Sequence, residues 1–249
     1  MIHKKSRDEI KRMCQAGHIV SLVHQKMKEV IEPGISTKEL DNIAMQIIKE
    51  NRASPTFLGY HGFPGCICAS INEQVVHGIP SEKVILKEGD IVSLDAGLIY
   101  KGYHSDAART HFVGQVSPEV KKLVEETKNS FFEGIKMAKA GNHLYDISNA
   151  IDAYISQFGY GIVRDLVGHG IGSELHEDPQ IPNFRQSRRG LKLQPGMTLA
   201  IEPMINMGRA DVDWMDDDWT VVAQDRLPSA HYENTILITD GEPEILTML

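Results

Sequence analysis

The chain has 249 residues, of which 41% are hydrophobic and 24% are charged, and its formal net charge is -8. This composition is typical of a soluble globular protein, and no apolar run is long enough to span a membrane. The acidic balance, without any block of lysine and arginine residues, argues against nucleic-acid binding. The charged segment from Met1 to Met13 is not expected to be a secretory signal, and three cysteines are too few for a disulfide framework, so we expect a cytoplasmic protein.

The first part of the chain predicts two helices followed by strands. Apolar residues recur at helical spacing from Ile10 to Val30, and the turn pair Pro33-Gly34 follows them. Ser36 and Glu39 then form a capping box in front of a second amphipathic segment. Runs of apolar and β-branched residues predict strands at 66–71, 91–99 and 110–113.

The same order of elements is predicted a second time. Ser117-Pro118 begins a helix that Gly141 is expected to end, and another helix is predicted over 144–155. Strands are then predicted at 162–167, 198–205, 220–223 and 235–239. We therefore expect one domain over residues 1–249, built from two similar halves, about 7–114 and 117–249, that share a mainly antiparallel sheet. Helices on one side of such a sheet make the expected fold class α+β.

Two aspartates flank the turn predicted at Lys101-Gly102. Asp95 lies in the otherwise apolar run 91–96, and Asp106 lies on the other side of the turn, so a hairpin would bring the two carboxylates together. Surface charge at strand ends is the alternative interpretation of such a pair. The apolar surroundings of Asp95 favour the functional interpretation, because a carboxylate in a buried strand needs a compensating cation or metal.

Three more polar residues interrupt apolar runs in the second half. His169 lies among the glycines of 168–172, Glu202 follows the apolar segment 198–201, and Glu233 precedes the apolar segment 235–238. Each of them alone is more often a solvated strand end than a ligand. Together with the two aspartates they supply four carboxylates and one imidazole, and four negative charges would neutralise two divalent cations.

The segments around these residues resemble a known family. The chain is similar to the five ligand motifs of type I methionine aminopeptidases, in order and with similar spacing, and the resemblance covers nearly the whole chain. The matching segments are 93–97, 102–106, 168–172, 200–203 and 232–235. The resemblance implies the pseudo-twofold pita-bread fold of peptidase family M24 and a metal-dependent aminopeptidase, which is a hydrolase. No inserted subdomain separates His169 from Glu202, which is similar to the short bacterial type I form.

The resemblance also implies a role for each residue. Two divalent ions, which could be manganese, iron, cobalt or zinc, would be held by Asp95, Asp106, His169, Glu202 and Glu233. His77 would contact the substrate near the scissile amide, His176 would stabilise the carbonyl oxygen, and Glu202 would move a proton towards the leaving amine. The pocket for the methionine side chain would be lined by Phe57, Tyr60, Phe63, Cys68, His77, Leu175 and Trp219. Phe57 and Leu175 replace a cysteine and a phenylalanine that are common in bacterial relatives.

The resemblance implies removal of the N-terminal methionine from peptides and nascent chains by a monomer, with no membrane or specific nucleic-acid partner. A transient contact with the ribosome fits this function, although the acidic segment 211–218 argues against docking through that hairpin. Two alternatives remain. A proline-specific aminopeptidase or dipeptidase of the same fold would use the same metals, but such relatives usually carry an extra amino-terminal domain. A non-catalytic binding protein would keep the fold without needing the ligand residues.

Overall fold

The computed structural model describes residues 2–248, and it contains the four helices that the sequence predicts. They are α1 (Arg7–Val30), α2 (Thr37–Glu50), α3 (Pro118–Ile135) and α4 (Leu144–Ile155). Ser6 with Glu9, and Ser36 with Glu39, form capping boxes that satisfy the first free backbone N–H groups of α1 and α2. A short 3-10 helix, η1 (Tyr60–Gly62), precedes the first long strands.

The expected end of α3 at Gly141 is wrong, because the helix ends at Ile135. The chain then turns, and the backbone N–H of Gly141 donates to the carbonyl of Leu193, 3.0 Å away. Gly141 has a φ of +95°, which glycine adopts without steric cost. The glycine signal therefore marks a turn that docks on a distant loop rather than the helix end itself.

The longest structure in the first half is a hairpin of β4 (Ile91–Tyr100) and β5 (Tyr103–Phe112). Lys101 and Gly102 at its turn have φ values of +50° and +81°. β4 also pairs with β1 (Ser54–Pro55) and β2 (Cys68–Ile71). The predicted strand 110–113 was too short, because the polar first part of β5, with His104, Ser105 and Asp106, lacks the apolar signal of a strand.

The second half contains a five-stranded sheet in the order β15-β14-β9-β7-β8. Its strands are β7 (Gly168–Gly170), β8 (Glu177–Ile181), β9 (Thr198–Ile201), β14 (Asn234–Leu237) and β15 (Glu244–Ile245). Two three-stranded sheets contain β6 (Gly161–Ile162), β10 (Met204–Asn206) and β13 (Ser229–His231), and β3 (Gln74–Val76), β11 (Val212–Trp214) and β12 (Val221–Ala223). Every strand pair within residues 2–248 is antiparallel, as expected.

Two predicted strands of this half are corrected. The predicted strand 198–205 is divided into β9 and β10, with Glu202 and Pro203 between them, because proline has no N–H to donate to a ladder. The predicted strand 162–167 contains only the end of β6, and Val163 and Leu166 after it fill core outside the regular strand. Glu202 therefore lies between two strands and not within one.

The expected single shared sheet is present as four separately bonded sheets, and the sheets that contain β13 and β14 contact β5. The backbone N–H of Glu233 donates to the carbonyl of Ala108 at 2.9 Å, and that of Asp106 donates to the hydroxyl of Thr235 at 3.0 Å. These bonds join residues far apart in the sequence and bring the start of β14 against the middle of β5. The internal similarity of the two halves stays a prediction.

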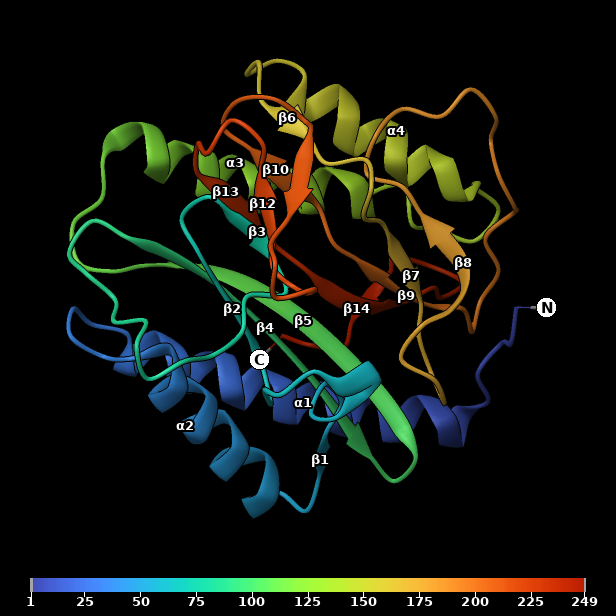
Figure 1. Ribbon diagram of the computed structural model, residues 1–249. Helices are drawn as coiled ribbons and strands as arrows, with labels where there is room; N and C mark the ends of the chain where they lie inside the picture. Colours follow the sequence, from blue (N-terminus) through green and yellow to red (C-terminus); the bar gives the residue numbers. More distant parts are fainter. Residues whose placement is uncertain (1, 249) are drawn as a thin grey trace.

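The helices cover the strands from outside. Figure 1 shows the pair α1 and α2 at the bottom of the view, the pair α3 and α4 at the top, and the strands between them. One buried cluster lies between α1, α2 and the strands β2 and β4, and another lies between α3, α4 and the strands β8, β9 and β14. Two cores thus hold the strands rigidly from both sides. Within residues 2–248, no helix has the length and apolar character that crossing a bilayer requires.

Candidate metal centre

The structure brings every candidate site residue to the wall of one cavity of about 120 Å³. The carboxylates and imidazole predicted as ligands come from five different segments. Asp95 lies in β4, Asp106 in β5 and His169 in β7, whereas Glu202 follows β9 and Glu233 lies between β13 and β14. Asp106 is paired across the hairpin with Gly97, two positions from Asp95, so the two aspartates are diagonal neighbours on one face.

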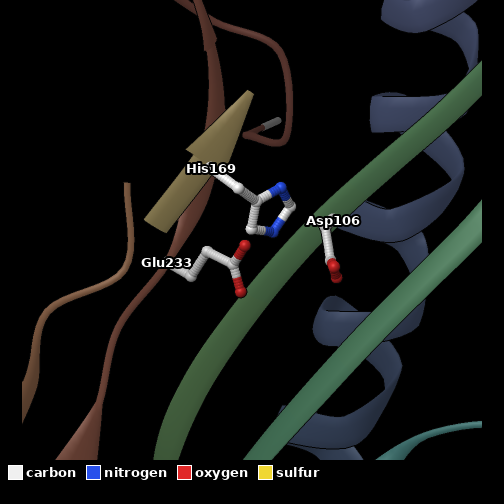
Figure 2. Close-up of side chains that lie close together, drawn as sticks. All are labelled: Asp106, His169 and Glu233. Atoms are coloured by element: carbon white, nitrogen blue, oxygen red, sulfur yellow. The ribbon is translucent and has the colours of Figure 1, made fainter. Parts of the chain in front are cut away.

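Three of these side chains form the tightest group. Ligand atoms of Asp106, His169 and Glu233 all lie within 4.8 Å of one another, and all three residues are buried. Figure 2 shows their side chains converging from three separate segments. The Nδ1 atom of His169 donates to the carbonyl of Gly170 at 2.8 Å, which leaves its Nε2 atom free to act as a ligand. This Nε2 atom lies 3.6 Å from an oxygen of Glu202.

The four carboxylates lie in a strongly perturbed environment. Burial raises the pKa values of Asp95, Glu202 and Glu233 well above their usual range, and the neighbouring charge of Asp106 raises them further. Burial also raises the pKa of Asp106 to about 6. One oxygen each of Asp95, Asp106 and Glu233 is buried without a hydrogen-bond partner.

These unpaired oxygens fit a cation. Buried carboxylates without partners are costly, and positive charge placed among them would remove that cost. Oxygen ligands with one imidazole nitrogen suit manganese, iron, cobalt or zinc. The residues present therefore fit divalent metal ions.

Two residues near this group were missed by the sequence analysis. The Nε2 atom of His231 is buried without a hydrogen-bond partner and lies 3.9 Å from oxygens of both Glu202 and Glu233. Arg109 donates to the backbone carbonyl of Glu233 and, at 2.5 Å, to the side-chain oxygen of Asn234. His231 could have been found, because it precedes Glu233 by two positions and extended backbone places such residues on the same side. Arg109 has no comparable signal in the sequence.

An apolar wall adjoins the five candidate ligands, and we call the cavity that contains both the metal-ligand cavity. Phe57, Phe63, Cys68 and Leu175 are buried in one cluster, and Tyr60 and Trp219 pack against it. The rings of Phe63 and Trp219 meet edge to face with centroids 5.1 Å apart. The cavity therefore combines a charged end with an apolar end of aromatic and sulfur-containing side chains.

Two histidines complete the cavity wall. His77 follows β3 with a φ of +60°, and burial lowers its pKa to about 4, so its imidazole is neutral at pH 7. His176 precedes β8, and its Nδ1 atom is hydrogen-bonded to the hydroxyl of Tyr60 at 2.9 Å. Burial also lowers the pKa of His176. Its ring packs edge to face on His169, with centroids 4.5 Å apart.

Comparisons with known proteins agree with this geometry. The sequence profile described as metallopeptidase family M24 matches residues 11–240. A methionine aminopeptidase from Clostridium acetobutylicum is 52% identical, over 100% of this chain and 99% of that protein. The crystal structure of a methionine aminopeptidase from Thermotoga maritima matches with a TM-score of 0.98 and 43% identity over 100% of both chains.

A more distant structure shares the fold alone. The prolidase from Pyrococcus furiosus matches 99% of this chain but only 65% of its own length, with a TM-score of 0.75 and 24% identity. The α+β architecture is the pita-bread fold that the sequence motifs imply. From its matching profile and its full-length relatives, the chain belongs to metallopeptidase family M24, in the methionine aminopeptidase branch.

Proposed function

We propose that this cavity removes methionine from the N-terminus of peptides and nascent chains by metal-dependent hydrolysis. One observation carries the proposal: a group of four buried or half-buried carboxylates and one imidazole shares a cavity with an apolar wall. The full-length similarity to methionine aminopeptidases supports the same reaction. A peptide whose first peptide bond lay between the two ends of the cavity would have its N-terminal side chain in the apolar part. The carbonyl of that bond would lie beside the proposed ligands.

We infer that two divalent ions are held there. The ligands would be Asp95, Asp106, His169, Glu202 and Glu233, whose four carboxylates balance the charge of two such ions. When bound, the ions would activate a water molecule for attack and act as Lewis acids on the carbonyl. The chain contributes a rigid arrangement, because each ligand comes from a strand or a strand end fixed by the two cores.

The chain's own residues would orient the substrate. Phe57, Phe63 and Cys68 offer aromatic and sulfur surfaces that suit a thioether side chain, alongside the remaining wall residues Tyr60, Leu175 and Trp219. Gly97 leaves room for this wall, because a Cβ atom there would lie 2.9 Å from the ring of Phe57. Phe57 stands where bacterial relatives commonly have cysteine, and Leu175 where they commonly have phenylalanine. These two differences would change the width of the pocket and not the reaction.

Two histidines and one carboxylate would act on the peptide bond. His77 is neutral and would hold the scissile amide in line for attack. The hydroxyl of Tyr60 would donate to Nδ1 of His176, so that Nε2–H faces the carbonyl oxygen and stabilises its developing charge. Glu202, whose pKa is raised by burial, would receive a proton from the attacking water and pass it to the leaving amine.

We place this activity in the cytoplasm, in a monomer that meets nascent chains through transient contact with the ribosome. The small number of cysteines, all three of which are free thiols, supports a reducing compartment. The acidic strand β11 and the turn after it carry Asp213, Asp216 and Asp218, so the contact would involve another surface.

The test is to incubate metal-loaded protein with Met-Ala-Ser, Met-Leu-Ser and Ala-Pro peptides and to identify the released residue by mass spectrometry. We expect release of methionine from Met-Ala-Ser. Release from the proline peptide alone would assign the chain to the proline-specific peptidases, and no release from any peptide would favour a binding protein. Asp95→Asn should abolish release, whereas Asp216→Asn, an equal change of charge at an exposed position, should not.

A further inference from the structure

A second cavity, of about 450 Å³, lies where α1, β5, α3 and the C-terminal segment meet. In the view of Figure 1, α1 passes behind β4 and β5, on the helix-covered side of the hairpin. None of the residues that line this cavity lines the metal-ligand cavity. We call it the cationic cavity, and its charged and polar wall includes His24, Lys28, Arg109, His111 and Lys128.

The charge of this wall is unusual for the chain. The formal net charge is -8, yet no aspartate or glutamate lines the cationic cavity. Among the ion pairs formed within residues 2–248, none involves Lys28 or Lys128. Within the part of the chain that the structure describes, Arg109 donates only to neutral oxygens. They are the backbone carbonyls of Ala108, Glu233 and Thr247 and the side-chain amide oxygen of Asn234. Among the described residues that line the cavity, Lys28, Arg109 and Lys128 therefore carry positive charge and none carries an acidic side chain.

Two imidazoles in the same wall each have one ring nitrogen without a hydrogen-bond partner. The Nε2 atom of His24 donates to the carbonyl of Ala107 at 2.8 Å, which fixes its tautomer and leaves Nδ1 as the second polar atom. Both His24 Nδ1 and His111 Nε2 are buried without a hydrogen-bond partner. The two rings are stacked, with centroids 6.3 Å apart and planes inclined by 21°. Buried polar atoms are normally paired, so two such atoms beside one cavity indicate a ligand.

The surroundings decide the class of ligand. Two imidazoles could bind a soft metal ion, but Lys28, Arg109 and Lys128 would repel any cation and no carboxylate would attract it. A wholly apolar ligand would leave both imidazole nitrogens unpaired. An oxyanion satisfies the lysines, and a phosphate group satisfies the imidazoles as well. Either it brings an O–H that donates to His24 Nδ1, or His24 takes up the proton and donates to a phosphate oxygen.

We propose that the cationic cavity binds a phosphate group, as inorganic phosphate or as a phosphomonoester. Lys28 on α1 and Lys128 on α3 would contact the phosphate oxygens. The imidazoles of His24 on α1 and His111 on β5 would form hydrogen bonds with the phosphate. The volume exceeds what inorganic phosphate needs, and the ring of Tyr232 and the side chains of Val124 and Met248 offer contacts for the organic part of a monoester.

The test is calorimetric titration of the metal-loaded protein with inorganic phosphate and, separately, with glycerol 2-phosphate. We expect saturable binding that falls about tenfold in each of Lys28→Gln and Lys128→Gln, since each loses one charge-assisted contact. Lys121→Gln is the matched control, because Lys121 lies on the same helix as Lys128 but outside the cavity. Tighter binding of the monoester would identify the source as an organic phosphate, and equal binding would identify inorganic phosphate.

The metal centre could itself attract phosphate, so a second variant separates the two sites. Asp95→Asn alters the metal-ligand cavity and should leave phosphate affinity at the cationic cavity within about twofold. If phosphate binding is lost in Asp95→Asn but kept in both lysine variants, the proposal is wrong. It is equally wrong if neither phosphate compound binds at millimolar concentration. Lys28 and Lys128 are exposed residues, so their replacement is not expected to unfold the protein.

Discussion

At the scale of single residues, the backbone and the side chain of His77 both have unusual properties. His77 holds an unfavourable left-handed backbone conformation and has a neutral, half-buried imidazole. Such strain persists where the surrounding structure enforces it, often at a functional site. It does not belong to the group of predicted metal ligands, so its role can be separated from theirs.

We expect His77→Ala to lower turnover about 10²-fold while metal content stays near that of the unmodified protein. The reason is that His77 would contact the substrate amide and not the ions. Turnover is measured on Met-Ala-Ser, and metal content by elemental analysis after desalting. His18→Ala, an exposed position, serves as the control. Loss of the metal in His77→Ala would refute the role proposed for this residue.

The hydroxyl of Tyr60 is expected to act through His176. Tyr60→Phe removes the bond of 2.9 Å to Nδ1 and frees the imidazole to adopt the other tautomer. We expect kcat to fall about tenfold with little change in KM, because the aromatic ring that packs on the substrate is retained. Steady-state kinetics on Met-Ala-Ser would reveal a larger effect on KM if Tyr60 only shaped the pocket.

At the scale of elements, the hairpin of β4 and β5 carries both aspartates and one wall of each cavity. Its face towards β14 presents Asp106, and Arg109 on the same strand bonds to the backbone around Glu233. The approach is close, since a Cβ atom at Gly97 would lie 3.1 Å from an oxygen of Asp106 and 2.9 Å from Phe57. The hairpin has no space for a larger side chain there.

Gly97→Ala is therefore expected to destabilise the protein by about 1–3 kcal/mol, the usual cost of overpacking. It should also weaken metal binding, because the added methyl group displaces Asp106. Urea unfolding gives the stability, and metal titration gives the affinity. Gly241→Ala is the control, since the nearest atom to its added Cβ would be 3.9 Å away. An unchanged unfolding midpoint in Gly97→Ala would contradict this prediction, because it would mean that the hairpin accommodates the methyl group without cost.

The contact between α1 and β5 buries neutral imidazoles. Burial lowers the pKa of His111 to about 4, below its value in the unfolded chain, about 6.5. Below pH 6.5 the unfolded chain thus binds more protons than the folded protein, and stability falls as the pH falls towards 4. We expect His111→Gln to reduce the loss of stability between pH 7 and pH 5 by about 1–2 kcal/mol. Urea unfolding of both proteins at the two pH values checks this, and equal losses would contradict it.

At the scale of the whole molecule, the two helix-covered cores meet across the carboxylates that we propose as metal ligands. The first core lies under the hairpin and the second under the sheet of β9 and β14, and the ligands lie at their junction. Repulsion among these four carboxylates, of which those of Asp106 and Glu233 are buried, would push the two parts of the molecule apart. Bound cations would hold them together, so metal binding and the stability of the whole fold are coupled.

Removal of metal by a chelator at pH 7.5 is expected to lower the melting temperature by several degrees, which corresponds to a few kcal/mol of lost binding energy. Calorimetry of the metal-loaded and chelated protein gives the difference. The shift should be much smaller in Asp95→Asn, because that variant has one buried negative charge fewer and binds metal more weakly. Equal melting temperatures with and without metal in the unmodified protein would argue against the coupling.

The sequence alone determined the four helices, although not the end of α3, and it determined the kinds of chemistry. Capping serines and helical periodicity set α1 and α2, because these signals act over a few residues. Acids and a histidine inside apolar runs identified the candidate ligands, since a buried charge is rarely tolerated without a partner. The hairpin turn at Lys101-Gly102 was likewise a local signal.

Only the tertiary structure decided which distant residues meet. Arg109 acquired its position beside Glu233 from the docking of β14 on β5, and His24 met His111 because α1 packs on that strand. The bond from Arg109 to the Glu233 carbonyl spans 124 positions and that from His24 to the Ala107 carbonyl spans 83, and such contacts leave no periodic pattern in either segment. The physical reason is that hydrogen-bonding and burial preferences act on neighbours along the chain, whereas a metal-ligand cavity is made by neighbours in space.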